Sequence, residues 1–272
     1  MSIINYVVRN FTQYTYLIDR RKMDNKQHKR LAFTLAEVLI TLGIIGIVAA
    51  LSIPTLISAY QKKTTALEVK KAYTELNQIL KMAIADYGEP LGWQYYGADE
   101  LPQWVQTYFV PYVNGAQHKA CNSNERCFGL ALPFSLHFKK PGSVNTIVGQ
   151  YVVSKLGSPV AYAFFRYPSP YDKVTRVKAY IRNPKKYAML GKDVFTFILT
   201  TADENPTFKP YGYGTLGSYG MSTKDRNTLL GTGWGGCNPK ASGSGYFGPG
   251  DACAAVIMMD GWKIAKDYPW TK

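Results

Sequence analysis

The chain has 272 residues, of which 46% are hydrophobic, and this length allows one sizeable globular domain with an extended element, or two small domains. Lys and Arg number 32 against 18 Asp and Glu, so the formal net charge is +14 at pH 7. The composition excludes a largely disordered chain, whereas the charge leaves nucleic acid and anionic lipid open as partners.

An uncharged and mostly aliphatic segment occupies residues 38–61. As a helix it would be roughly 35 Å long, which is enough to cross a bilayer core of about 30 Å. A buried helix of a soluble protein is the alternative, but such helices seldom stay uncharged for this long. Four bases stand just before the segment, namely Lys22, Lys26, Lys29 and Arg30. The positive-inside rule therefore predicts a cytoplasmic N-terminus and an extracytoplasmic C-terminal bulk.

Glu37 lies at the cytoplasmic start of this apolar segment. An ionised carboxylate costs up to about 3 kcal/mol at the centre of a bilayer and less near its edge, so Glu37 needs a partner. A secretory signal would place small residues after its apolar region, whereas here the small residue Ala32 precedes it.

The apolar segment begins within the run Lys29-Arg30-Leu31-Ala32-Phe33-Thr34-Leu35-Ala36-Glu37-Val38-Leu39-Ile40. This run resembles the processing site of type IV prepilins and type II secretion pseudopilins. In that family a membrane peptidase cuts before a Phe, and the new terminal amine is methylated. The resemblance implies a cut between Ala32 and Phe33 and an N-methylated Phe33. It also implies that Glu37, the fifth mature residue, meets the terminal amine of a neighbouring subunit. Helix-loosening residues are expected where pilins carry them, at Gly43, Gly46 and Pro54.

Beyond residue 61 apolar residues recur every three or four positions, at Ala66, Val69, Tyr73, Leu76, Leu80, Ala83 and Tyr87. This spacing predicts an amphipathic helix, and Gly88 before Glu89-Pro90 is a stop signal. One helix of about 80 Å is therefore expected over about 34–87. Its second half is expected to pack on a sheet of the same chain rather than on a coiled-coil partner.

The rest of the chain predicts a β-rich domain. A short helix is expected at 101–109, and strands are expected at 146–153, 160–166, 174–181 and 194–201. In the strand expected at 174–181, the apolar residues Val177, Ala179 and Ile181 alternate with polar ones, which indicates that one side of this strand faces solvent. Residues 255–259 and 262–265 resemble a hairpin around the turn Asp260-Gly261. Residues 206–251 are rich in Gly and are expected to form a surface loop suited to contacts.

The predicted fold class is α+β and type IV pilin-like, with an antiparallel sheet of about four to six strands. Residues 1–32 are predicted to be a cleaved basic leader, and 33–60 a transmembrane and assembly helix. Residues 61–88 continue that helix, and 89–272 form the extracytoplasmic β-rich domain, including the Gly-rich loop at 206–251.

Four cysteines fall in two local pairs, Cys121 with Cys127 and Cys237 with Cys253, at spacings that do not match a zinc site. Outside the cytoplasm they are predicted to form two disulfides. The late acids are too dispersed for a calcium site, so no metal or cofactor is predicted; they are Asp193, Asp203, Glu204 and Asp251. No nucleophile elbow or acid pair accompanies the three histidines, and we expect no catalytic residues and no enzyme.

The resemblance implies a structural subunit of a type IV pilus or type II secretion filament. Its partners would be a prepilin peptidase, identical or related pilin subunits, inner-membrane lipid and assembly platform proteins. Its location would be the bacterial inner membrane, with one span, and then a cell-surface filament.

Two alternatives remain open. One is a DNA-uptake pilin that holds phosphates and bases through Lys209, Tyr211, Tyr213, Lys224 and Arg226. The other is an unprocessed, single-span binding protein, because the family usually has Gly where this chain has Ala32.

Overall fold

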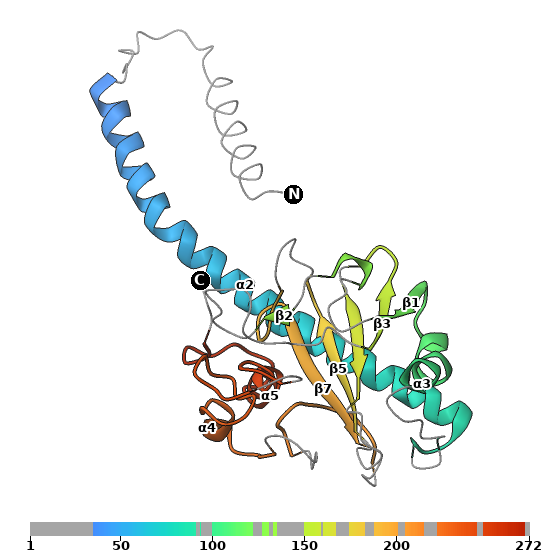
Figure 1. Ribbon diagram of the computed structural model, residues 1–272. Coiled ribbons are helices and arrows are strands. Elements are labelled where there is room, and N and C mark those ends of the chain that lie inside the picture. The colour runs from blue at the N-terminus through green and yellow to red at the C-terminus, as the bar shows by residue number, and fades with distance from the viewer. Residues whose placement is uncertain are drawn as a thin grey trace. The chain divides into compact units, whose positions relative to one another are not determined.

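The computed structural model describes residues 35–90, 93, 100–121, 127–130, 133–134, 150–158, 160–166, 174–182, 188–200, 205–214, 222–243 and 247–269. The chain divides into two compact parts, Met1–Ile53 and Pro54–Lys272. The second part holds the sheet and the helices that cover it (Figure 1).

The helix α2 spans Leu35–Tyr87, which confirms the prediction of one helix over about 34–87. It ends at Gly88, whose φ is +76° and whose N–H donates to the Ile84 carbonyl at 2.8 Å. Glycine adopts this left-handed conformation without a Cβ penalty. The buried side chains of α2 form one face of its second half, and they are Thr65, Ala66, Val69, Ala72, Leu76, Ile79, Leu80 and Ala83. This is the predicted amphipathic face.

The sheet has six antiparallel strands in the order β1-β3-β4-β5-β7-β8. Their bounds are Ala116–Ala120 for β1, Tyr151–Lys155 for β3, Ala161–Phe165 for β4, Val174–Tyr180 for β5, Val194–Thr200 for β7 and Phe208–Pro210 for β8. Strands β4, β5 and β7 lie where the sequence predicts them, and β3 overlaps its predicted range. Two short strands, β2 (Pro133–Phe134) and β6 (Ala188–Met189), pair in parallel.

One face of the sheet packs against the second half of α2, which crosses it in Figure 1. The Tyr162 hydroxyl on β4 donates to the Glu75 carboxylate of α2 at 2.9 Å. The Asn77 side chain bonds both backbone groups of Phe208, accepting from its N–H at 2.9 Å and donating to its carbonyl at 3.1 Å. These bonds tie both a central strand and the edge strand β8 to the helix.

The other face of the sheet is covered by the Gly-rich C-terminal segment. Phe247 lies 6.2 Å from the Phe165 ring of β4 and stacks at 4.4 Å on Tyr211. Every residue of β5 is buried, and Tyr180 at its end belongs to a second cluster with Leu130 and Leu190. The prediction of a solvent-facing side for this strand is therefore wrong. The surface-loop prediction for 206–251 is also wrong in part, because Tyr211 and Phe247 belong to the core.

Short helices complete the domain. The helix α3, Leu101–Tyr108, confirms the helix predicted at 101–109, and the 3-10 turns η3 and η4 span Val110–Tyr112 and Cys127–Gly129. Trp93 stacks on Tyr108 of α3 with ring centroids 4.3 Å apart. The helix α4, Arg226–Leu229, begins at Asp225, whose carboxylate accepts from the N–H groups of Asn227 and Thr228.

The predicted C-terminal hairpin is wrong, because its first arm lies in the helix α5, Cys253–Met259. Gly261 has a φ of +68°, and its N–H donates to the Met258 carbonyl at 3.1 Å. The Trp262 N–H donates to the Ile257 carbonyl at 2.8 Å. These two bonds form the Schellman ending of a helix. A short apolar run fits a buried strand and a buried helix equally well. The dipeptide Asp-Gly is likewise suited both to a hairpin turn and to the C-terminus of a helix.

Candidate functional site

The first half of α2 presents apolar side chains to its surroundings. The large exposed ones between 35 and 60 are Leu35, Val38, Leu39, Ile40, Leu42, Ile44, Ile45, Ile47, Val48, Leu51, Ile53, Leu56, Ile57 and Tyr60. Consecutive residues of a helix lie about 100° apart, so this set surrounds the helix on all sides. By length and composition α2 could cross a membrane, and its most apolar window is not buried in the described part of the chain. Such a surface fits membrane anchoring or contact with partner helices.

Two hydroxyl groups of this stretch donate hydrogen bonds within the helix. Thr41 Oγ1 donates to the Val38 carbonyl at 3.0 Å, and Ser52 Oγ donates to the Val48 carbonyl at 2.8 Å. Bonds of this kind let Ser and Thr enter an apolar medium without an unsatisfied donor. Thr41 and Ser52 are thus compatible with lipid, whereas Glu37 is the charged exception in this stretch.

Glu37 lies in the first turn of α2 and is exposed. It is the sole acidic residue between Asp24 and Glu68 in the sequence. A carboxylate at a helix N-terminus is favoured by the helix dipole, which offsets part of its cost in an apolar medium. Its proposed partner, the amine of Phe33, and Ala32 both lie outside the described residues.

Gly43, Gly46 and Pro54 all lie inside α2. A Cβ added at either glycine would meet nothing within 4 Å, so packing within the chain does not require glycine there. The suggested role of the three residues in loosening the helix stays a prediction.

Both predicted disulfides are present. Cys121 is bonded to Cys127 and Cys237 to Cys253, with Cα atoms 6.1 and 4.6 Å apart. The second bond joins the Gly-rich segment to the first residue of α5 and is buried.

Two protein families match parts of the chain. A family of unknown function, DUF6613, matches residues 55–271, which is most of the sequence. The chain belongs to DUF6613. The prokaryotic N-terminal methylation motif matches residues 27–53 of this DUF6613 member. No curated protein and no solved structure matches it.

The methylation motif is the prepilin-type cleavage and methylation motif, and this DUF6613 protein is therefore type IV pilin-like. The matched range contains Ala32, Phe33 and Glu37, together with Gly43 and Gly46. The motif implies processing by a prepilin peptidase and assembly with other pilin subunits. A long apolar helix followed by an antiparallel sheet has the pilin-like layout.

Of the four acids considered for calcium, the structure describes Asp193 and Asp251. Among the described residues no group of three or more His, Cys, Asp or Glu could hold a metal ion. Asp193 accepts from the Met189 N–H at 3.0 Å, and Asp251 is buried under the sheet. Asp203 and Glu204 lie outside the described residues.

The residues considered for DNA binding differ in their exposure and in their partners. Tyr211 is in the core and cannot stack on a base. Arg226 holds Asp260 through bonds of 2.5 and 2.8 Å and Asp267 through two bonds of 2.7 Å. Lys224 is exposed, while Lys209 and Tyr213 are half-buried. The set does not form one basic and aromatic surface.

Sequence reasoning missed a buried polar group under the sheet. Lys178 of β5 and Asp251 are both fully buried, and Asp251 accepts hydrogen bonds from Thr196 Oγ1 and from the Gly248 N–H. Burial lowers the pKa of Lys178, and the Asp251 carboxylate opposes that shift. Burial likewise raises the pKa of Asp251, against the effects of Lys178 and the two hydrogen bonds. Lys178 and Thr196 lie more than 50 residues before Asp251, so no local pattern could have revealed that these three residues come together.

Proposed function

We propose that this protein is a structural subunit, a pilin or pseudopilin, of a type IV pilus or type II secretion-type filament. The observation that supports the proposal is the exposed apolar half of α2 with Glu37 in its first turn, directly within the methylation motif. Removal of residues 1–32 would make Phe33 the terminus and leave Glu37 as the fifth residue. The protein would then polymerise through this helix, and we propose no enzymatic activity for it.

Assembly follows from the cost of isolated charges in an apolar filament core. The amine of Phe33 on one subunit and the Glu37 carboxylate of a neighbour would each cost several kcal/mol if buried alone. Together they form one ion pair, which specifies the axial register between subunits. The inner membrane would hold the subunit beforehand, and assembly platform proteins would be its partners during extraction.

The experiment has two steps. The full chain is expressed with a prepilin peptidase and an assembly system, and the membrane-extracted protein is examined by intact mass and N-terminal sequencing. A methylated Phe33 terminus is expected. An uncut Met1 terminus would instead support the single-span anchored protein.

The second step tests assembly with Glu37→Leu. The variant is expected to be inserted and processed normally, while the yield of sheared filaments falls at least about tenfold because the amine loses its partner. Glu89→Leu removes an exposed carboxylate just beyond α2 and serves as the matched control, with filaments retained. Normal filaments from Glu37→Leu would refute the proposed role of this residue.

A further inference from the structure

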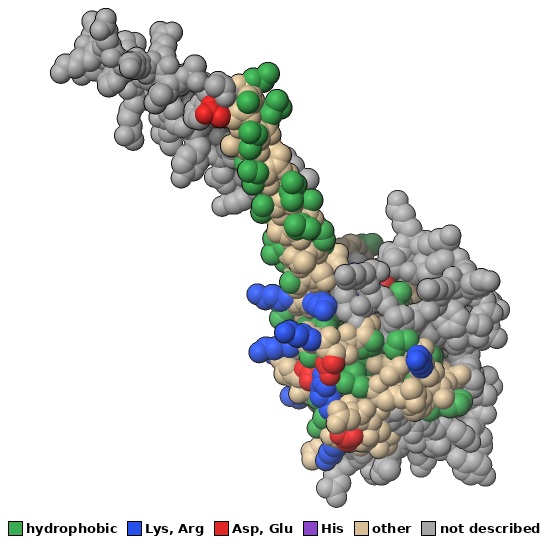
Figure 2. All heavy atoms as spheres, turned by 90° about the vertical axis from the view of Figure 1, so that its left-hand side faces the viewer, with side chains coloured by type: hydrophobic (Ala, Val, Ile, Leu, Met, Phe, Trp, Pro, Cys, Tyr) green, Lys and Arg blue, Asp and Glu red, His purple; other side chains and the backbone are tan. Residues whose placement is uncertain are grey.

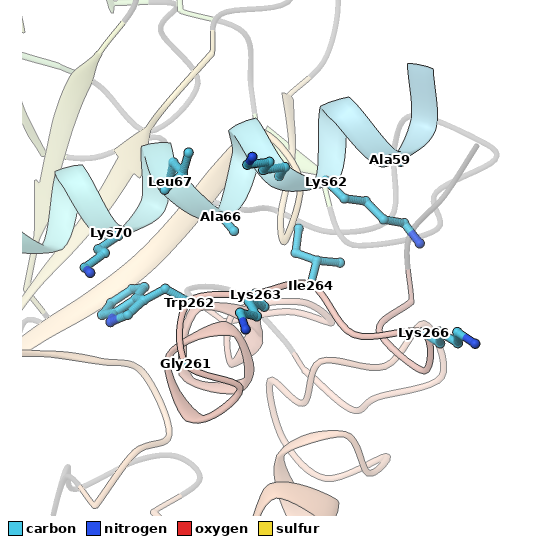
Figure 3. A pocket seen from close by; sticks show the side chains of 11 residues that line it. Ala59, Lys62, Ala66, Leu67, Lys70, Gly261, Trp262, Lys263, Ile264 and Lys266 are labelled. Atoms are coloured by element: carbon cyan, nitrogen blue, oxygen red, sulfur yellow. The ribbon is translucent and has the colours of Figure 1, made fainter. Parts of the chain in front are cut away.

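A hollow of about 640 Å³ lies between α2 and the segment that follows α5. Figure 3 shows α2 on one side and residues 261–266 on the other, with Trp262 near Lys70 and Ile264 directed toward the helix. All of the lining residues belong to the compact part Pro54–Lys272.

The hollow is lined by lysines and by no carboxylate of the described chain. The lysines are Lys62, Lys63, Lys70, Lys263 and Lys266. In Figure 2 basic side chains gather where the apolar part of the helix meets the domain, with a few acidic side chains beside them. This concentration of one sign of charge attracts anions.

The acids that could neutralise these lysines are already bound elsewhere. Asp260 and Asp267 flank the segment 261–266 in sequence, and both are held by Arg226. Glu68 of α2 is paired with Arg182 at 2.8 Å. The single Arg226 charge offsets one of its two aspartates, so five lysines at the hollow stand against one uncompensated carboxylate charge, and the local net charge is positive.

The remaining lining is apolar and ordered. Leu67, Ala66 and Ile264 contribute aliphatic surface, and Trp262 adds an indole ring. The Schellman ending of α5 fixes the backbone of Trp262, and its ring lies 5.1 Å from that of Tyr73. A cationic rim over an apolar, Trp-bearing wall matches a ligand that has both a phosphate and a hydrocarbon part. Trp is also enriched at membrane interfaces.

The position of the hollow along α2 indicates that this ligand is a lipid of the bilayer. Its lining begins at Ala59, and Lys62 and Lys63 follow the last residues of the uncharged segment 38–61. The headgroup layer of a bilayer is roughly 5–7 Å thick on each side. If the apolar segment spans the core, these lysines reach the headgroup layer within one helical turn. A second copy of this chain is a poor occupant, because without residues 1–32 it still has 25 Lys and Arg (32 − 7) against 16 Asp and Glu (18 − 2).

We propose that this hollow binds the phosphate headgroup of an anionic phospholipid at the membrane surface, with the start of the acyl chains against Ala59 and Ile264, at the end of the hollow nearer the apolar segment. The proposal rests on the membrane-anchored subunit of the proposed function. It adds a lipid site that would hold the subunit at a fixed depth and orientation before extraction.

The test uses the full-length chain in detergent, and native mass spectrometry measures its binding of phosphatidylglycerol and of phosphatidylcholine with the same acyl chains. We expect phosphatidylglycerol to bind at least about tenfold more tightly, since each lysine near an anionic surface contributes on the order of 1 kcal/mol, or about fivefold. The triple variant Lys62→Gln/Lys263→Gln/Lys266→Gln should lose most of this preference. The control Lys81→Gln/Lys224→Gln/Lys240→Gln removes the same charge from exposed positions and should keep it within about twofold.

Four outcomes would overturn the proposal. Equal binding of both lipids would show that the hollow does not recognise an anionic headgroup. Equal loss of the lipid preference in both triple variants would show that the preference comes from the overall charge of the protein and not from this site. Displacement of the lipid by millimolar inorganic phosphate would indicate a free-anion site instead. Tighter binding of a short DNA duplex that competes with the lipid would assign the hollow to nucleic acid. Processing at Phe33 is scored in the same preparations, so loss of lipid preference in correctly processed protein would refute the lipid site alone.

Discussion

At the scale of single residues, Lys178 at the centre of the sheet and Asp251 of the segment that covers it are both buried, and the charge of each opposes the burial-induced pKa shift of the other. The Lys178 ammonium lies 5.1 Å from the Phe165 ring centroid, and the Asp251 carboxylate accepts from Thr196 and Gly248. A buried pair of this kind adds little net stability compared with apolar residues, but removal of one partner leaves a buried charge uncompensated. We infer that the pair specifies how the C-terminal segment docks on β5 and β7.

This inference is tested with the variants Asp251→Asn, Lys178→Met and the double variant. Each single substitution is expected to lower the free energy of unfolding by about 3 kcal/mol, because the remaining group loses its partner. The double variant should lose at least about 1 kcal/mol less than the sum. Denaturant unfolding of the full chain in detergent, followed by tryptophan fluorescence, measures all three. Additivity within about 0.5 kcal/mol would mean that the two side chains do not interact.

At the scale of elements, α2 combines two different sequence patterns in one helix. Its first half is apolar on all sides, whereas its second half has a single buried face. The first half contains glycines at positions where a Cβ would fit. Their presence is therefore not explained by packing within the chain, which leaves local loosening of the helix as their predicted use.

The double variant Gly43→Ala/Gly46→Ala tests that use. Each substitution should favour the helix by about 1 kcal/mol. We expect unchanged insertion and processing but a lower filament yield, measured on sheared filaments, if this stretch must loosen during assembly. Ile45→Leu, on the same exposed stretch, is the control that leaves glycine content unchanged. Parent-level filament yield in the glycine variant would exclude a need for loosening.

At the scale of the whole molecule, the C-terminal segment is held to the domain by several long-range connections. The Cys237–Cys253 disulfide, Arg226 with its two aspartates, and the Tyr268 hydroxyl bonded to the Gly191 carbonyl at 2.5 Å all contribute. A segment with little regular structure needs such connections because it forms few backbone ladders. The same connections set the position of residues 261–266 beside α2.

The two disulfides are expected to contribute different amounts to the free energy of unfolding. Cys237→Ser/Cys253→Ser opens a loop with a sequence separation of 16, and it should lower the free energy of unfolding by about 3 kcal/mol on the chain-entropy estimate. Cys121→Ser/Cys127→Ser opens a loop with a separation of 6 and should cost less, about 2 kcal/mol. Denaturant unfolding of both variants and of the parent protein measures which variant loses more stability. A larger loss for the shorter loop would contradict the estimate.

The sequence by itself determined the features that depend on near neighbours. The long helix, its stop at Gly88, its apolar half and the strands β4, β5 and β7 follow from periodicity and composition over short windows. The two disulfides follow from local cysteine pairs and the predicted compartment. Glu37 stands out because a carboxylate is costly beside an apolar segment, whatever the rest of the fold.

Only the tertiary structure decided the features whose partners lie far apart in the chain. Strand β1, Ala-Gln-His-Lys-Ala, has no β-branched residue and forms because β3 offers it an edge. Strand β5 reads as half-exposed, yet Lys178 is buried because a segment more than 60 residues later covers that face. The run after Cys253 is a helix because burial and the closing bonds of Gly261 and Trp262 outweigh its strand-like composition. The lysine-lined hollow likewise depends on packing that brings residues 261–266 beside α2, about 200 residues away in the sequence. The ion pairs of Arg226 with Asp260 and Asp267 hold the two ends of that segment.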